Sequence, residues 1–175
     1  MSIDHVTPRI YVACLAAYNN GKLHGVWIDA LNSEPDEIRE AVQAMLKTSP
    51  EPDAEDFAIH DYEGFAGVRL SEWESFEQVH MLAQFIDSYG ELGAKLLSHC
   101  DNDVEDAKMV MDDDYAGCYH SAADFAEELT TETTQIPENL QVYIDYECMA
   151  RDWEMSGDIF TIETAYDEVH IFWNR

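Results

Sequence analysis

Six consecutive residues near the middle of the chain, Asp101-Asn102-Asp103-Val104-Glu105-Asp106, begin with the spacing of oxygen ligands found in calcium loops. Such a loop also needs glycine at its sixth position, for a sharp turn, and a bidentate glutamate at its twelfth. Here the sixth position is Asp106 and the twelfth is Asp112. The same residues fit the start of a helix better, so a calcium-dependent binding module is kept only as an alternative.

Cysteine and histidine side chains offer a second candidate metal site, from His99-Cys100 together with Cys118 and His120. Zinc sites usually draw their ligands from tighter pairs, such as CxxC or HxxxH. Buried thiols and surface histidines are therefore the simpler interpretation.

Signatures of catalysis are missing from the sequence, which has no GxSxG, no HExxH and no glycine-rich phosphate loop. With 37 carboxylates, some pair will lie at glycosidase spacing by chance, so paired acids carry no information. We expect a protein that is not an enzyme and that binds no cofactor and no metal.

The carboxylates themselves are the dominant chemical feature. The 175 residues contain 37 Asp and Glu against 9 Lys and Arg, which gives a formal charge of −28. This charge is spread through the whole chain rather than gathered in a tail, so it opposes compact folding by self-repulsion. Duplex DNA carries about one charge per 1.7 Å, so 28 charges correspond to about 48 Å of duplex, or about 14 base pairs. The nine basic residues are scattered singly, which argues against direct binding of nucleic acid.

Composition predicts a folded chain, because 46% of the residues are hydrophobic and 11% aromatic, unlike acidic disordered chains. No apolar run is long enough to span a membrane. Residues 1–6 show no basic or apolar region of a signal peptide. The four cysteines are far apart, which favours reduced, mostly buried thiols in a cytoplasmic protein.

The N-terminal residues predict a β-hairpin. Stretches 9–17 and 22–29 are rich in β-forming side chains, and Tyr18-Asn19-Asn20-Gly21 between them is a turn signal that tolerates positive φ. A helix should follow a capping box at Ser33 and Asp36, with Pro35 in its first turn. Residues 56–62 are expected to form a third strand, which completes an α+β domain over residues 1–64.

The middle of the chain is expected to form a helical domain over residues 65–107. Ser75 and Gln78 resemble a capping box before an apolar stripe, and a short helix is expected over 91–99. Asp103 can cap a further helix, which Gly117 could end.

The C-terminal residues predict a second α+β domain over residues 108–175. Ser121 begins a capping box with Asp124, and another helix should run from Pro137 to Gly157. Strands over 158–164 and 168–173 are expected to form a hairpin. The fold class is therefore α+β, with three small domains in the order α+β, all-helical, α+β.

Three stretches resemble ArdA-type antirestriction proteins, and the resemblance covers nearly the whole chain. Residues 10–29 (Ile10-Tyr11-Val12 to Trp27-Ile28-Asp29) are similar to the opening hairpin of that family. Residues 104–129, from Val104-Glu105-Asp106-Ala107 through Tyr115-Ala116-Gly117-Cys118-Tyr119, are similar to its antirestriction motif. Residues 143–152 also match.

The resemblance implies an elongated protein of three domains that dimerises through its C-terminal domain. Its carboxylates would imitate the phosphates of bent B-form DNA. It would occupy the DNA groove of a type I restriction–modification enzyme, at the methyltransferase core, and so protect incoming mobile DNA. The carboxylates expected to face this partner are Glu72, Glu74, Glu77, Asp87, Glu91, Asp101, Asp103, Glu105, Asp106, Asp112, Asp113, Asp114, Asp124, Glu127, Glu128 and Glu132.

A second interpretation of the charge stays open beside this one. An acidic domain from a salt-adapted organism would carry its charge for solvation alone. It should lose structure at low ionic strength, whereas a DNA mimic should keep it.

Overall fold

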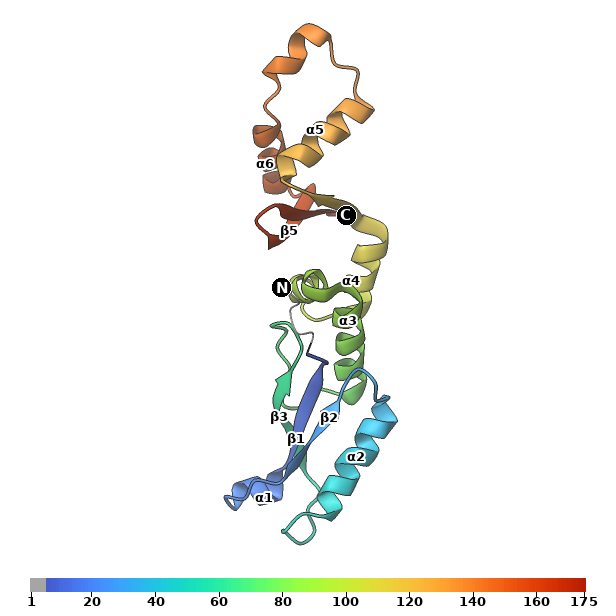
Figure 1. Cartoon of the computed structure of the whole chain (residues 1–175), viewed down its shortest axis with the longest axis vertical. Coiled ribbons are helices and arrows are strands. Elements are labelled where there is room, and N and C mark those ends of the chain that lie inside the picture. The colour runs from blue at the N-terminus through green and yellow to red at the C-terminus, as the bar shows by residue number, and fades with distance from the viewer. Residues whose placement is uncertain (1–5) are drawn as a thin grey trace. The chain divides into compact units, whose positions relative to one another are not determined.

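The computed structural model describes residues 6–175. The prediction that the chain has no signal peptide concerns residues 1–6, most of which lie outside that range. Helices and two antiparallel sheets make up the described chain, which confirms the α+β class (Figure 1). Contacts gather the chain into two compact units, residues 1–104 and 105–175. The three-domain arrangement, its boundaries and the elongated shape stay predictions.

The N-terminal unit is built on a sheet of three antiparallel strands in the order β2-β1-β3. The strands are β1 (Arg9–Cys14), β2 (Gly25–Asp29) and β3 (Phe57–Glu63). Strand β1 pairs on both edges and places Ile10 and Val12 in the core without any exposed surface. The predicted pairing and the third strand are confirmed.

The predicted turn between the first two strands is wrong. Helix α1 (Leu15–Asn19) follows β1 directly, because Leu15-Ala16-Ala17 is a run of good helix formers. Gly21 takes a φ of 74° beyond the end of that helix. Residues 22–24 therefore belong to a loop and not to the second strand.

Helix α2 (Pro35–Lys47) packs against β1, β2 and the next helix, and buries Ile38, Val42, Met45 and Leu46. Its capping box is formed by Glu34 and Glu37, not by Ser33 and Asp36. A residue that precedes proline is restricted to extended backbone, so Pro35 makes Glu34 the last extended residue before the helix.

Helix α3 (Phe76–His99) is capped by Ser75, whose hydroxyl accepts a hydrogen bond from the Gln78 N–H, as predicted. The helix is interrupted at Gly90, whose φ of 58° and ψ of −138° suit glycine alone. The segment after this kink is the short helix expected over 91–99. Helix α4 (Val104–Met109) begins next, and its Val104 and Ala107 are buried.

The C-terminal unit holds a second antiparallel sheet in the order β4-β6-β5. The strands are β4 (Tyr115–Tyr119), β5 (Ile159–Ala165) and β6 (Glu168–Trp173). The β5–β6 hairpin is confirmed, whereas β4 was not predicted. Gly117, expected to end a helix, lies instead at a β-bulge in β4 with a φ of 133°. The helix ends earlier, in the π-helix η1 (Val110–Asp114).

Helices α5 (Ala122–Thr133) and α6 (Tyr146–Ser156) pack together beside this sheet. Phe125 lies at the centre of the core with Ile159, Val169 and Ile171. Ser121 caps α5 as predicted.

The single helix predicted from Pro137 to Gly157 is wrong. The 3-10 helix η2 (Glu138–Tyr143) ends at Ile144, and the Asp145 carboxylate accepts from the Cys148 N–H to begin α6. Side-chain capping here competes with continuation of the helix. Gly157 ends α6 with left-handed backbone, as predicted.

Candidate partner-binding surface

The carboxylates of the described residues all lie on the surface. None is buried, and only Asp29, Glu51, Glu74 and Asp114 are half-buried. Apart from His80, the buried side chains of the described residues are apolar, and the carboxylates are left to the outside. The predicted partner-binding carboxylates are all accessible in this sense, Glu74 and Asp114 less than the others.

Basic side chains neutralise only a small part of this surface. Some of the ion pairs are local, such as Glu91 with Lys95 at 2.9 Å, and others join distant segments, such as Arg9 with Glu63 at 2.7 Å. With 9 Lys and Arg against 37 Asp and Glu, most carboxylates have no basic side chain to pair with. Exposed ion pairs of this kind contribute about 0–1 kcal/mol each. The folded chain therefore keeps a strongly negative exterior.

Helix α5 carries the most regular group of predicted site residues, Asp124, Glu127, Glu128 and Glu132, which are all exposed. Residues three and four apart lie on one face of a helix, so these four carboxylates form a single stripe, which we call the α5 stripe. Phe125 and Ala126 are the residues of this helix that are buried. No basic residue lies in the last turn of the helix to offset the charge.

The α5 stripe also acts on a neighbouring tyrosine. Burial raises the pKa of the Tyr119 hydroxyl above its usual value, and the charges of Glu128 and Glu132 and a hydrogen bond to Glu128 raise it further. Tyr119 thus stays protonated, as a hydrogen-bond donor beside the acidic stripe.

The π-helix η1 holds three consecutive acids, Asp112, Asp113 and Asp114. Single π turns inside helices are rare and often lie at functional sites. Asp112 and Asp113 are exposed and form no ion pair or hydrogen bond within the described part of the chain. Asp114 differs, because its side chain is only 17% exposed and pairs with Arg175 at 3.2 Å. The Asp114 carboxylate is therefore partly neutralised by an ion pair within the C-terminal unit.

The segment that resembles a calcium loop forms the turn between α3 and α4. Asp101 and Asn102 take positive φ values of 52° and 63°, and the Asn102 N–H donates to the Leu97 carbonyl at 2.8 Å. Across residues 6–175, no group of three or more His, Cys, Asp or Glu side chains is placed to hold a metal ion. Asp101, Asp103, Glu105 and Asp106 are exposed around this turn.

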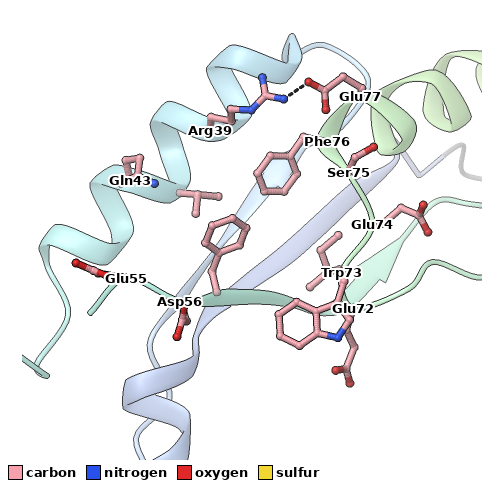
Figure 2. A pocket seen from close by; sticks show the side chains of 13 residues that line it. Arg39, Gln43, Glu55, Asp56, Glu72, Trp73, Glu74, Ser75, Phe76 and Glu77 are labelled. Atoms are coloured by element: carbon pink, nitrogen blue, oxygen red, sulfur yellow. Dashed lines mark hydrogen bonds and ion pairs between the residues drawn. The ribbon is translucent and has the colours of Figure 1, made fainter. Parts of the chain in front are cut away.

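The remaining predicted residues lie in the N-terminal unit. Asp87 and Glu91 are exposed on α3, on either side of the kink at Gly90. Glu72, Glu74 and Glu77 lie along one side of a groove of about 590 Å³ (Figure 2). We call it the α2–α3 groove, because α2 forms one side and the start of α3 and the segment before it form the other.

The aromatic residues of this groove were not recognised from the sequence as part of a site. Phe57 and Phe76 stack with ring centroids 5.6 Å apart, and both line the groove together with Trp73. The available signal was the interleaving of Trp73 with acids on both sides, Glu72 and Glu74. It could not show which aromatic rings would lie side by side.

None of the four cysteines, all within the described range, forms a disulfide; Cys14 and Cys100 are buried, whereas Cys118 and Cys148 are exposed. Within the described range, no helix is both long and apolar enough to cross a membrane. Fold and surface together define an acidic α+β protein whose carboxylates, across residues 6–175, all lie on the exterior.

Comparison with known families gives this surface its context. The family model described as antirestriction protein (ArdA) matches residues 10–168. The chain belongs to the ArdA family of antirestriction proteins, as the resemblance in its sequence indicated. A search of curated proteins found no match.

Proposed function

We propose that this protein is a DNA mimic that occupies the DNA-binding groove of a type I restriction–modification enzyme and so protects incoming mobile DNA. Membership of an antirestriction family supports the general activity. The observation that carries the finer proposal is the placement of carboxylates, none of which is buried among residues 6–175.

The α5 stripe supports mimicry on quantitative grounds. Its first and last members, Asp124 and Glu132, are eight residues apart, a rise of about 12 Å at 1.5 Å per residue. Four charges over about 12 Å give one charge per about 4 Å, close to the roughly 3.4 Å per phosphate along one DNA strand. A basic groove that is shaped for a phosphate backbone therefore meets a similar line of charge.

Inhibition by mimicry needs no chemistry on the partner. The protein competes with DNA for one groove, so inhibition should be stoichiometric and without turnover. Its place of action is the cytoplasm, where restriction enzymes meet incoming DNA.

A homodimer formed through the domain at 108–175 is part of the proposal. Helix η2 exposes three apolar side chains, Leu140, Val142 and Tyr143, of which Val142 and Tyr143 are 82% and 80% exposed. Contiguous exposed apolar residues mark interaction surfaces more often than isolated ones do. Type I enzymes read two half-sites, so a two-fold symmetric mimic suits them.

Dimerisation can be tested by light scattering at micromolar concentration. Val142→Asp with Tyr143→Asp should yield a folded monomer, because both side chains are largely exposed. Leu23→Asp, at an 88% exposed position in the N-terminal unit, is the matched control and should remain a dimer. A wild-type chain that is monomeric at these concentrations would contradict the dimer.

Competition between the protein and a DNA duplex for a purified type I methyltransferase core tests the function itself. We expect displacement of DNA at a fixed stoichiometry, with affinity that falls as salt rises because ion pairing is screened. Inhibition that persists far below stoichiometric amounts would indicate an enzyme instead. Far-ultraviolet circular dichroism in low salt separates the salt-adapted alternative, which requires loss of structure there.

A further inference from the structure

The α2–α3 groove differs from the rest of the acidic surface, because its floor is apolar. Val42, Phe57, Ile59 and Phe76 line it. Trp73 also lines the groove and is 68% exposed, although tryptophan is usually well covered in a folded chain. Phosphates have no counterpart to an aromatic floor, so mimicry of DNA does not explain this feature.

The rim of the groove is acidic and largely unpaired. Glu55, Asp56 and Glu72 line it, and in the described part of the chain their carboxylates form no ion pair or hydrogen bond. At the opposite end, Arg39 pairs with Glu77 (Figure 2). Arg39 also pairs with Asp36 at 2.7 Å. A cationic side chain of this protein thus already occupies one end of the rim.

The same unit shows how an arginine is held by a tryptophan and an acid together. The Arg9 guanidinium lies 4.7 Å from the centroid of the Trp27 ring and pairs with Glu63 at 2.7 Å. Arginine stacks on aromatic faces and is weakly hydrated, so it suits a site that combines a ring with carboxylates. Trp73 and Glu72 offer this combination with no cation of the chain paired to Glu72.

We propose that the α2–α3 groove is a docking site for an arginine-bearing basic segment of the partner protein. An arginine of that segment stacks on Trp73, and its guanidinium donates hydrogen bonds to Glu72 and Asp56. An apolar side chain next to it lies on Phe57 and Phe76. This inference deepens the proposed function, and the restriction enzyme is the partner to which it applies.

The groove would change how binding responds to salt. Pure charge pairing between exposed groups is screened over about 10 Å at 0.1 M salt and about 3 Å at 1 M. Contact between apolar surfaces is not weakened by salt in this way. The groove therefore supplies the part of the affinity that remains at high ionic strength.

The first experiment measures binding of the purified methyltransferase core to wild-type protein, Trp73→Ala and Trp73→Phe, at 0.1 M and 0.5 M NaCl. We expect Trp73→Ala to weaken binding about five- to thirty-fold at both salt concentrations, and Trp73→Phe to weaken it less. Leu23→Ala removes an exposed apolar side chain of the same unit outside the groove and should have no effect. Equal affinity of wild type and Trp73→Ala at 0.5 M NaCl would overturn the docking site.

The second experiment does not depend on the restriction enzyme. The probe is the peptide acetyl-Gly-Arg-Leu-Arg-Gly-amide, compared with its uncharged citrulline counterpart in 0.3 M NaCl, by nuclear magnetic resonance of the labelled full-length chain. We expect shifts at the Trp73 indole N–H and at Ile59 with the arginine peptide, and much smaller shifts with citrulline. They should also diminish in the triple variant Glu55→Gln, Asp56→Asn, Glu72→Gln.

The two experiments separate the two proposals. A methyltransferase core that fails to bind the wild-type chain refutes the proposed function, while the peptide still tests the groove. Identical responses to the arginine and citrulline peptides, or shifts elsewhere only, refute the groove whatever the enzyme does.

Discussion

Neutralising the α5 stripe is the sharpest test of whether the acidic surface is a binding device. The perturbation is the triple variant Glu127→Gln, Glu128→Gln, Glu132→Gln, which removes three charges with little change in shape. Asp124 is kept, because an acid in the first turn of a helix is stabilised by the helix dipole.

The expected change in stability follows from the spacing along α5. The triple variant removes three like-charge contacts, between Asp124 and Glu127, Asp124 and Glu128, and Glu128 and Glu132. Each such contact destabilises a helix by about 0.2–0.5 kcal/mol, so the variant should gain about 0.6–1.5 kcal/mol. For a unit of this size the gain corresponds to a rise of a few degrees in Tm.

The expected change in inhibition has the opposite sign. Exposed ion pairs with the partner contribute about 0–1 kcal/mol each, so three of them should cost about 1.5 kcal/mol, or about ten-fold in the inhibition constant. The assay is competition with duplex DNA for the methyltransferase core, with the melting temperature measured in parallel. A protein that is more stable yet inhibits less would show that charge is kept for binding at the expense of folding.

The matched control removes three charges from exposed acids on three different elements, Glu40 on α2, Asp61 on β3 and Glu154 on α6. These residues form no stripe, so inhibition should change by about three-fold or less. Equal losses from the stripe and from the control would refute the reasoning, because net charge alone would then determine inhibition. A single change such as Asp112→Asn should barely alter inhibition, whereas an abrupt loss would indicate a discrete site.

Three further predictions concern stability. Gly90→Ala forces alanine into a φ of 58° and ψ of −138°, which should lower the free energy of unfolding by about 1–3 kcal/mol. In urea titration, Ser88→Ala on the same helix is the control and should change the midpoint little. An unchanged midpoint for Gly90→Ala would contradict the backbone strain. Phe125→Ala should cost about 3–5 kcal/mol, because the ring packs in the C-terminal core, and a loss under 1 kcal/mol would be inconsistent with its burial. Burial lowers the pKa of His170 below its usual 6.5, so its contribution is present above pH 6.5 and is lost as the pH falls toward the folded-state value. Tm should therefore decrease from pH 7.5 to 5.5, and by less in His170→Gln than in wild type or in the exposed-site control His120→Gln; the same decrease in all three would exclude His170 as the cause.

Local sequence signals predicted the elements whose formation depends on neighbouring residues. The caps at Ser75 and Ser121, the helix end at Gly157 and the β5–β6 hairpin are all confirmed. Each of these elements depends on hydrogen bonds and backbone preferences within a few residues, which can be predicted from the sequence. The dispersal of charge could also be predicted without the structure, because the positions of the acidic residues are given by the sequence.

The wrong predictions of secondary structure have two other causes, tertiary contacts and competing local hydrogen bonds. Strand β4 exists because Tyr115 and its neighbours pair with β6, at least 50 residues later in the chain. The helix that was expected to reach Gly117 therefore ends at Asp114. The break at Asp145 arose from a side-chain cap that outweighed helical continuation.

The sequence by itself determined that this protein is acidic throughout, folded around apolar cores and α+β in class. Local composition and short-range hydrogen bonding fix those properties. Only the tertiary structure decided which carboxylates keep a free charge, as the contrast between Asp113 and the Arg175-paired Asp114 shows. It alone brought Phe57 and Phe76 together beside Trp73, because contacts between distant segments depend on packing and not on sequence spacing.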